Sequence, residues 1–141
     1  MSVNPLPFAD QVVIMETVLV VEDEVVIRSS ISEYLRRCAY RVLEAGDAEE
    51  ALVILRKPSV KVDVLFTNIE MPGSVNGFEL ARRARELRPE IQVILTGTLE
   101  RAADAAAGLC EDSPLPKPYE PQVVVDRIKR LLAGRASESE P

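Results

Sequence analysis

The chain has 141 residues, 47% of them hydrophobic and 28% charged, and its formal net charge at pH 7 is -6. This length and composition predict one soluble globular domain with a single core. The acidic balance argues against a nucleic-acid backbone or an anionic membrane as the main partner, because both attract basic surfaces. No apolar run approaches the roughly 20 residues that span a bilayer, and the N-terminus lacks a signal-peptide pattern. We therefore expect a cytoplasmic protein.

The residue inventory narrows the chemistry further. The sequence contains no histidine, which removes histidine-assisted nucleophiles and histidine-ligated metals from consideration. Its two cysteines, Cys38 and Cys110, are far apart and match no metal-binding or redox spacing. Cys38 falls at helical spacing from apolar neighbours, so we expect a small core residue rather than one half of a disulfide.

Two residue periods alternate along the chain and predict strands followed by helices. The hydrophobic runs expected to form strands are residues 17–22, 40–45, 61–67 and 91–97, with a very brief fifth strand within 113–121. The segments with helical apolar spacing are residues 24–38, 46–57, 77–89, 99–108 and 122–134. In the second of these helices, Asp47 followed by Glu50 resembles a capping box.

Five strand–helix units in alternation predict a parallel sheet with helices on both faces. Residues 17–133 are expected to form this single domain. Residues 1–16 precede it as an N-terminal extension, whose apolar segment QVVIM is expected to pack on the domain or on a partner. Residues 134–141 are polar and follow the expected end of the last helix at Gly134, so we predict a disordered tail.

The candidate site lies at the carboxyl ends of the strands, where ligands bind in open doubly wound sheets. The first strand ends in Glu22 and Asp23, the third in Asn68 and the fourth in Thr96, while the fifth segment delivers Lys117. Two acids, an amide, a hydroxyl and an ammonium group would thus meet at one rim.

Each of these residues also has a purely structural explanation when it is considered alone. Asp23 can serve as a helix N-cap, and Asn68 as a turn residue. Thr96 can satisfy its hydroxyl with a backbone group, and Lys117 can be a solvated surface lysine. The position of each residue at its own strand end, in this order, favours a functional site.

Four motifs, VLVVEDE, VLFTNIEMPG, VILTG and PLPKPYEP, resemble the receiver domain of two-component response regulators in order and spacing. The resemblance covers residues 17–133 and implies a flavodoxin-like α/β fold, a doubly wound five-stranded parallel sheet with strand order 2-1-3-4-5. Receiver domains accept a phosphoryl group on an aspartate, from a sensor histidine kinase or a phosphotransfer protein. The resemblance therefore implies a signalling module with protein partners rather than an enzyme.

The resemblance also assigns a metal site. Glu22 and Asp23 correspond to the acidic pair that holds Mg²⁺, and the backbone carbonyl of Glu70 to a further ligand. Asn68 stands where the phospho-accepting aspartate, also a metal ligand, belongs. Because an amide oxygen is neutral and a poor nucleophile, we expect that the chain cannot form the usual acyl phosphate and that Mg²⁺ binds weakly.

The remaining motif residues correspond to the part of the family that reports phosphorylation. Thr96 corresponds to the hydroxyl that follows the phosphoryl group, and Lys117 to the cation that pairs with it, before a cis peptide to Pro118. The family usually has an aromatic residue three positions before the lysine, and here that position is Pro114. Proline has a fixed φ and no N–H, so it cannot act as a rotating side chain.

Three functions remain open at this point. The first is a single-domain response regulator in a phosphorelay, with Asn68 as an Asp-to-Asn variant that is not phosphorylatable. The second is a natural pseudo-receiver that binds a downstream protein target without phosphorylation. The third is a metal-dependent phosphohydrolase, which would need an aspartate nucleophile after the first strand. We expect the partner contact, or a homodimer, to involve the last helix and the segment around Pro114, or the N-terminal extension.

Overall fold

The computed structural model describes the backbone of residues 14–98 and 113–139, and the side chains of residues 14–98 and 113–135. The predicted helix at residues 99–108, Cys110 and most of the N-terminal extension lie outside these described residues. The two described residues of the segment QVVIM, Ile14 and Met15, are both exposed, with relative accessibilities of 66% and 38%.

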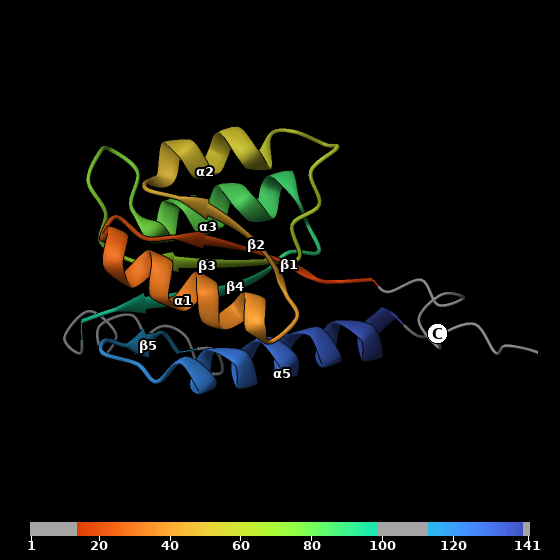
Figure 1. Ribbon diagram of the computed structural model, residues 1–141. Helices are drawn as coiled ribbons and strands as arrows, with labels where there is room; N and C mark the ends of the chain where they lie inside the picture. The colour runs from red at the N-terminus through yellow and green to blue at the C-terminus, as the bar shows by residue number, and fades with distance from the viewer. Residues whose placement is uncertain (1–13, 99–112, 140–141) are drawn as a thin grey trace, which may run out of the picture.

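The centre of the fold is a five-stranded sheet in which all strands run parallel (Figure 1). The strands are β1 (Thr17–Val21), β2 (Arg41–Ala45), β3 (Val64–Asn68), β4 (Gln92–Gly97) and β5 (Leu115–Pro116). Their order across the sheet is β2-β1-β3-β4-β5, which confirms the predicted order. The very brief fifth strand is also confirmed, because β5 has only two residues.

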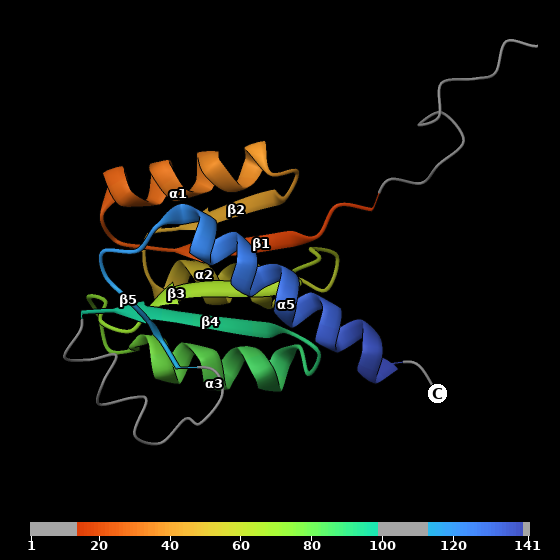
Figure 2. The same cartoon turned by 90° about the horizontal axis from the view of Figure 1, so that it is seen from below.

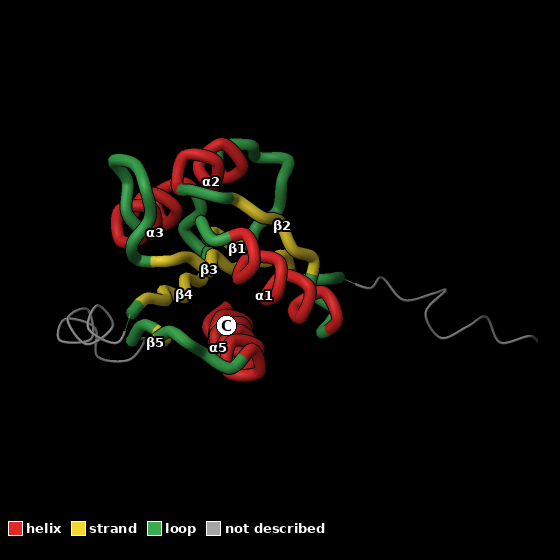
Figure 3. The backbone as a smooth tube through the Cα atoms, turned by 60° about the vertical axis from the view of Figure 1, so that its left-hand side comes forward, coloured by secondary structure: helices red, strands yellow, loops and turns green. Residues whose placement is uncertain are grey.

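Helices cover both faces of the sheet, as the alternation of strands and helices predicted. They are α1 (Val25–Arg37), α2 (Ala48–Leu55), α3 (Gly77–Leu87) and α5 (Pro121–Ser139). α1 and α5 lie on one face, and α2 and α3 on the other, which gives three layers (Figures 1 and 3). None of these described helices combines the length and the apolar character that crossing a bilayer requires.

The two faces have separate cores because successive side chains of a strand point to opposite faces. In β1, Val18 and Val20 face α1 and α5, and Leu19 and Val21 face α2 and α3. All four are at most 1% exposed. A β1 that is hydrophobic throughout is therefore what a central strand covered on both faces requires. Burial of each such side chain contributes about 1.5–3 kcal/mol to folding.

Local capping fixes where two of the helices begin. The Asp47 side chain accepts a hydrogen bond from the backbone N–H of Glu50 at 2.8 Å, which confirms the predicted cap of α2. Asn76 accepts one from the N–H of Glu79 at 2.9 Å and caps α3 in the same way. At α1, the capping position is held by Glu24, which makes no side-chain cap, so the alternative of Asp23 as an N-cap is wrong.

The last helix is longer than the sequence predicted. α5 continues past Gly134 to Ser139, so the helix end predicted at Gly134 is wrong (Figure 2). Among the described glycines, Gly73 is the one with a positive φ. Gly134 therefore does not adopt the left-handed backbone of a helix-ending glycine. The added turn also gains an ion pair, between Arg135 and the buried carboxylate of Asp63 at 3.2 Å.

Gly77, at the first position of α3, lets this helix approach the end of β3 closely. A Cβ at this position would lie 1.9 Å from the carbonyl oxygen of Asn68 and 2.8 Å from the Cα of Ile69. The Gly77 N–H instead donates to the Ile69 carbonyl oxygen at 2.7 Å. The start of α3 therefore packs against the backbone of Asn68 in a contact that only glycine permits.

We predict that Gly77→Ala destabilises the domain by roughly 1–3 kcal/mol, because the added methyl group overlaps backbone atoms that have little room to move. Gly134→Ala is the matched control. Nothing lies within 4 Å of a Cβ at Gly134, so alanine should stabilise this helix by roughly 0.5–1 kcal/mol. Urea unfolding followed by circular dichroism measures both changes, and equal effects of the two substitutions would contradict the close approach at Gly77.

Candidate functional site

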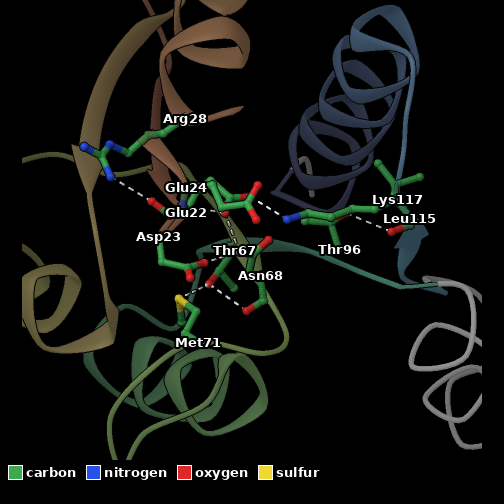
Figure 4. A network of polar contacts seen from close by, with 10 residues as sticks. All are labelled: Glu22, Asp23, Glu24, Arg28, Thr67, Asn68, Met71, Thr96, Leu115 and Lys117. Carbon is green, nitrogen blue, oxygen red and sulfur yellow. Dashed lines mark hydrogen bonds and ion pairs between the residues drawn. The ribbon is translucent and has the colours of Figure 1, made fainter. Parts of the chain in front are cut away.

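The sheet brings the predicted site residues together at one rim. In the parallel register, Val21 lies beside Thr67, and Asn68 lies beside Thr96. The carboxyl ends of β1, β3 and β4 therefore lie side by side, and the segment after β5 adds Lys117 next to them (Figure 4). The prediction that these groups converge is confirmed by the geometry described next.

Glu22 is the buried centre of the rim. Its side chain is only 3% exposed and accepts hydrogen bonds on both carboxylate oxygens. Oε1 pairs with the Lys117 Nζ at 2.6 Å, and Oε2 accepts from the Asn68 Nδ2 at 2.7 Å and from the Glu24 N–H at 3.0 Å. A buried carboxylate is stable in the fold only when it is paired in this way.

Asn68 joins the two acids of the rim. Its Nδ2 donates to Glu22 and also to the Asp23 Oδ1, at 3.0 Å. Its Oδ1 is buried and has no hydrogen-bond partner among the described residues. The side chain is 4% exposed, so it is a core residue of the rim and not the exposed turn residue that was its structural alternative.

Lys117 is not the solvated lysine of its structural alternative, since its side chain is 23% exposed and bonded to Glu22. The peptide bond to Pro118 is cis, as the family resemblance implied. The backbone N–H of Lys117 donates to the Gly97 carbonyl oxygen at 2.6 Å, which fixes the lysine to the end of β4.

Thr96 directs its hydroxyl to the backbone. Its Oγ1 donates to the Leu115 carbonyl oxygen at 2.9 Å. This is the hydrogen bond to a backbone group that was expected for Thr96 considered alone. The bond straps β5 to β4, where the prolines at 114 and 116 have no N–H to donate. Pro114 occupies the position where the family usually has a switch aromatic, and it is buried.

Two residues near the rim were not singled out from the sequence. The Nη1 of Arg28 donates to the backbone carbonyl of Glu22 at 2.8 Å and so holds the turn after β1. Tyr119 packs edge-on against Phe66, with ring centroids 5.5 Å apart. Burial, and then the negative charge of Glu22, raise the pKa of the Tyr119 phenol well above its usual value. The sequence signal that could have identified Tyr119 was its position two residues after Lys117.

A polar pocket of about 470 Å³ opens over the rim. Its lining includes Asp23, Asn68, Glu70, Thr96 and Lys117, so all but one of the residues predicted from the sequence contribute. The exception, Glu22, lies beneath the pocket as the partner of Lys117. The pocket is large enough for a phosphoryl group or a hydrated metal ion.

The donor set only partly suits the Mg²⁺ that the fold implies. Glu22 and Asp23 offer the carboxylates that Mg²⁺ prefers. However, the Asn68 group between them is an N–H donor, which cannot ligate a cation, and both oxygens of Glu22 are already bonded. No group of three or more His, Cys, Asp or Glu side chains suited to a metal is found among the described residues.

An apolar groove of about 390 Å³ adjoins the polar pocket. It lies between α1 and the start of α5, and Ile27 and Lys117 line both hollows. Its other lining residues are Val26, Ser30, Ile31, Pro118, Tyr119 and Pro121. Val26, at the edge of this groove, is 77% exposed.

Comparisons with known proteins agree with this architecture. The chain is 32% identical over 123 residues to the phosphate regulon transcriptional regulatory protein PhoB of Pseudomonas aeruginosa, covering 83% of this chain and 52% of PhoB. It is 35% identical over 125 residues to the transcriptional regulatory protein ResD of Bacillus subtilis, covering 86% and 50% of the two chains. The chain thus spans about half the length of the curated relatives it matches.

Solved structures show the same fold over most of the chain. A CheY-like receiver domain protein from Methanospirillum hungatei superimposes with a TM-score of 0.76 at 25% identity, covering 89% of this chain and all of that one. The response regulator TrrA from Thermotoga maritima, solved with Mg²⁺ and BeF, gives a TM-score of 0.70 at 28% identity, covering 83% and 99%. Residues 18–129 match the family model of the response regulator receiver domain, and the chain belongs to that family.

Proposed function

We propose that this receiver domain acts in two-component signalling through protein contacts and does not accept a phosphoryl group at Asn68. The observation that carries the proposal is the bonding of Asn68, whose Nδ2 donates to Glu22 and Asp23 at the rim. Phosphoryl transfer to a side chain requires a nucleophilic oxygen that attacks phosphorus. An amide with its N–H group turned toward the acids does not supply one.

The remaining rim residues support a receiver origin for the site. Glu22, Asp23, Thr96 and Lys117 lie where the family resemblance expects its metal-binding, hydroxyl and cationic groups. An Asp-to-Asn variant of a phosphorylated regulator and a natural pseudo-receiver share this chemistry, and the parent codon for Asn68 separates them. The phosphohydrolase would need an aspartate nucleophile after the first strand, and it is disfavoured because Asp23 there is bonded to the Asn68 amide and Glu22 is buried and paired with Lys117.

We place the partner contact at the apolar groove between α1 and α5. A protein that docks over the polar pocket would also cover this groove, since Ile27 and Lys117 line both. A sensor histidine kinase or a phosphotransfer protein fits this requirement, and a downstream protein target can use the same face. Exposed Val25 and Val26 would supply apolar contact area.

We predict that Asn68→Asp gains a phosphoryl group from acetyl phosphate and Mg²⁺, while the unsubstituted chain gains none. The substitution supplies the charged oxygen nucleophile, and the acids, threonine and lysine are already in place. Intact mass spectrometry detects the adduct. Asn76→Asp is the matched control, because Asn76 is an exposed N-cap that does not line the polar pocket, and its aspartate should remain unmodified. An alkali-labile adduct on the unsubstituted chain would place the acceptor elsewhere.

We also predict that Asn68→Asp lowers the stability of the metal-free domain by roughly 1–4 kcal/mol, because a third carboxylate replaces a donor beside Glu22 and Asp23. Mg²⁺ should restore part of this loss, since it binds the folded site and not the unfolded chain. Thermal midpoints with and without Mg²⁺ test this, with Asn76→Asp expected to change little.

For the groove, we predict that Val26→Glu weakens binding of a purified sensor kinase or phosphotransfer partner by roughly tenfold, because a charge replaces buried apolar contact. Val53→Glu is the matched control. Val53 is 53% exposed on α2, on the opposite face of the sheet. Isothermal titration calorimetry compares the two, and equal losses would remove the groove from the contact.

A further inference from the structure

The rim of this chain is closed by its own donors in the place where a divalent cation would bind. Glu22 receives the Lys117 ammonium on Oε1 at 2.6 Å and the Asn68 amide on Oε2 at 2.7 Å. The same amide reaches the Asp23 Oδ1 at 3.0 Å. Both acids that would ligate a metal are thus already paired within the fold.

The direction of the Asn68 amide follows from its neighbours. Carboxylates accept hydrogen bonds and do not donate them, so only the Nδ2 end of the amide can face two of them. The opposite orientation would place three acceptor groups together. The consequence is that Oδ1 points away from the acids and has no partner among the described residues.

The ammonium of Lys117 is directed to Glu22 for a related reason. Glu22 is 3% exposed, and a carboxylate buried to this degree requires a cation within bonding distance. Lys117, whose side chain is 23% exposed, supplies that cation. Asn68 carries no charge, so at this position it offers the lysine no competing ion pair. The lysine therefore neutralises the acid at the end of β1, from the far edge of the sheet.

We propose that Asn68 and Lys117 together replace a bound cation at Glu22 and Asp23, so that the rim keeps one closed state without metal or phosphoryl group. This inference rests on the proposed function only for the identity of the site. Mg²⁺ can enter only if Lys117 leaves Glu22 and the amide of Asn68 turns over. The domain is then a metal-independent binding module.

The hydrogen bonds of Asn68 to Glu22 and Asp23, together with the Lys117–Glu22 ion pair, form a clamp that also affects the structure outside the pocket. Lys117 is fixed to β4 through its N–H bond to Gly97, and Thr96 straps β4 to the Leu115 carbonyl of β5. The Lys117–Glu22 pair extends these links to β1. The ends of β1, β4 and β5 are thereby tied together, and the groove beside them keeps its shape without a ligand.

The test compares thermal midpoints with and without millimolar Mg²⁺, at constant ionic strength, for the unsubstituted chain and three variants. Lys117→Met should lower the midpoint and gain a Mg²⁺ response, with an apparent affinity at least roughly tenfold higher, because Glu22 has lost its partner. Lys117→Arg keeps the charge and should stay insensitive. Lys129→Met, at an exposed position on α5, is the matched control and should behave as the unsubstituted chain.

The side-chain amide of Asn68 gives a second readout that needs no substitution. In ¹⁵N NMR spectra of the unsubstituted chain, its two N–H signals should be protected from exchange and should not move with millimolar Mg²⁺. Saturable movement below millimolar Mg²⁺, or a Lys117→Met variant that folds and stays insensitive to Mg²⁺, would overturn the clamp. Failure of the Asn68→Asp variant to become phosphorylated would instead count against the proposed function and leave the clamp intact.

Discussion

The burial of one carboxylate, Glu22, is the constraint on which the rim depends. An ion taken out of water destabilises the fold by several kcal/mol unless partners replace the lost hydration. Here the partners come from elements far apart in sequence, with Asn68 at the end of β3 and Lys117 after β5. The fold must therefore hold three strand ends in register for this one charge to be tolerated.

The sheet meets that requirement because its strands are parallel and covered on both faces. Two separate cores fix each strand from both sides, so the positions of the strand ends are set by packing far from the rim. The close approach of Gly77 to the backbone of Asn68 adds a contact at the chain segment that carries the amide. The strand ends thus position the polar groups, of which Asn68 and Thr96 lie in strands and Glu22, Asp23 and Lys117 follow directly after β1 and β5.

The two departures from the family pattern act on the same path. Asn68 removes the acceptor charge, and Pro114 removes the aromatic side chain expected to swing. In their place the chain has a bonded amide and a hydroxyl strap from Thr96 to β5. Tyr119 is the aromatic ring near the rim among the described residues, and it is packed on Phe66. These features suit a domain that presents a fixed surface to a partner.

The sequence by itself determined the alternation of strands and helices, the two-sided burial of β1 and the identity of the rim residues, because periodicity and strand-end position are local properties. It did not determine which groups would bond. Asp23 was a plausible helix cap and Lys117 a plausible surface lysine. Only the parallel register placed Asp23 against Asn68 and Lys117 against Glu22. The length of α5 was likewise a tertiary matter. Local signals predicted its end at Gly134, but α5 runs to Ser139, and Arg135 beyond Gly134 makes a long-range ion pair with Asp63 that no local signal indicates.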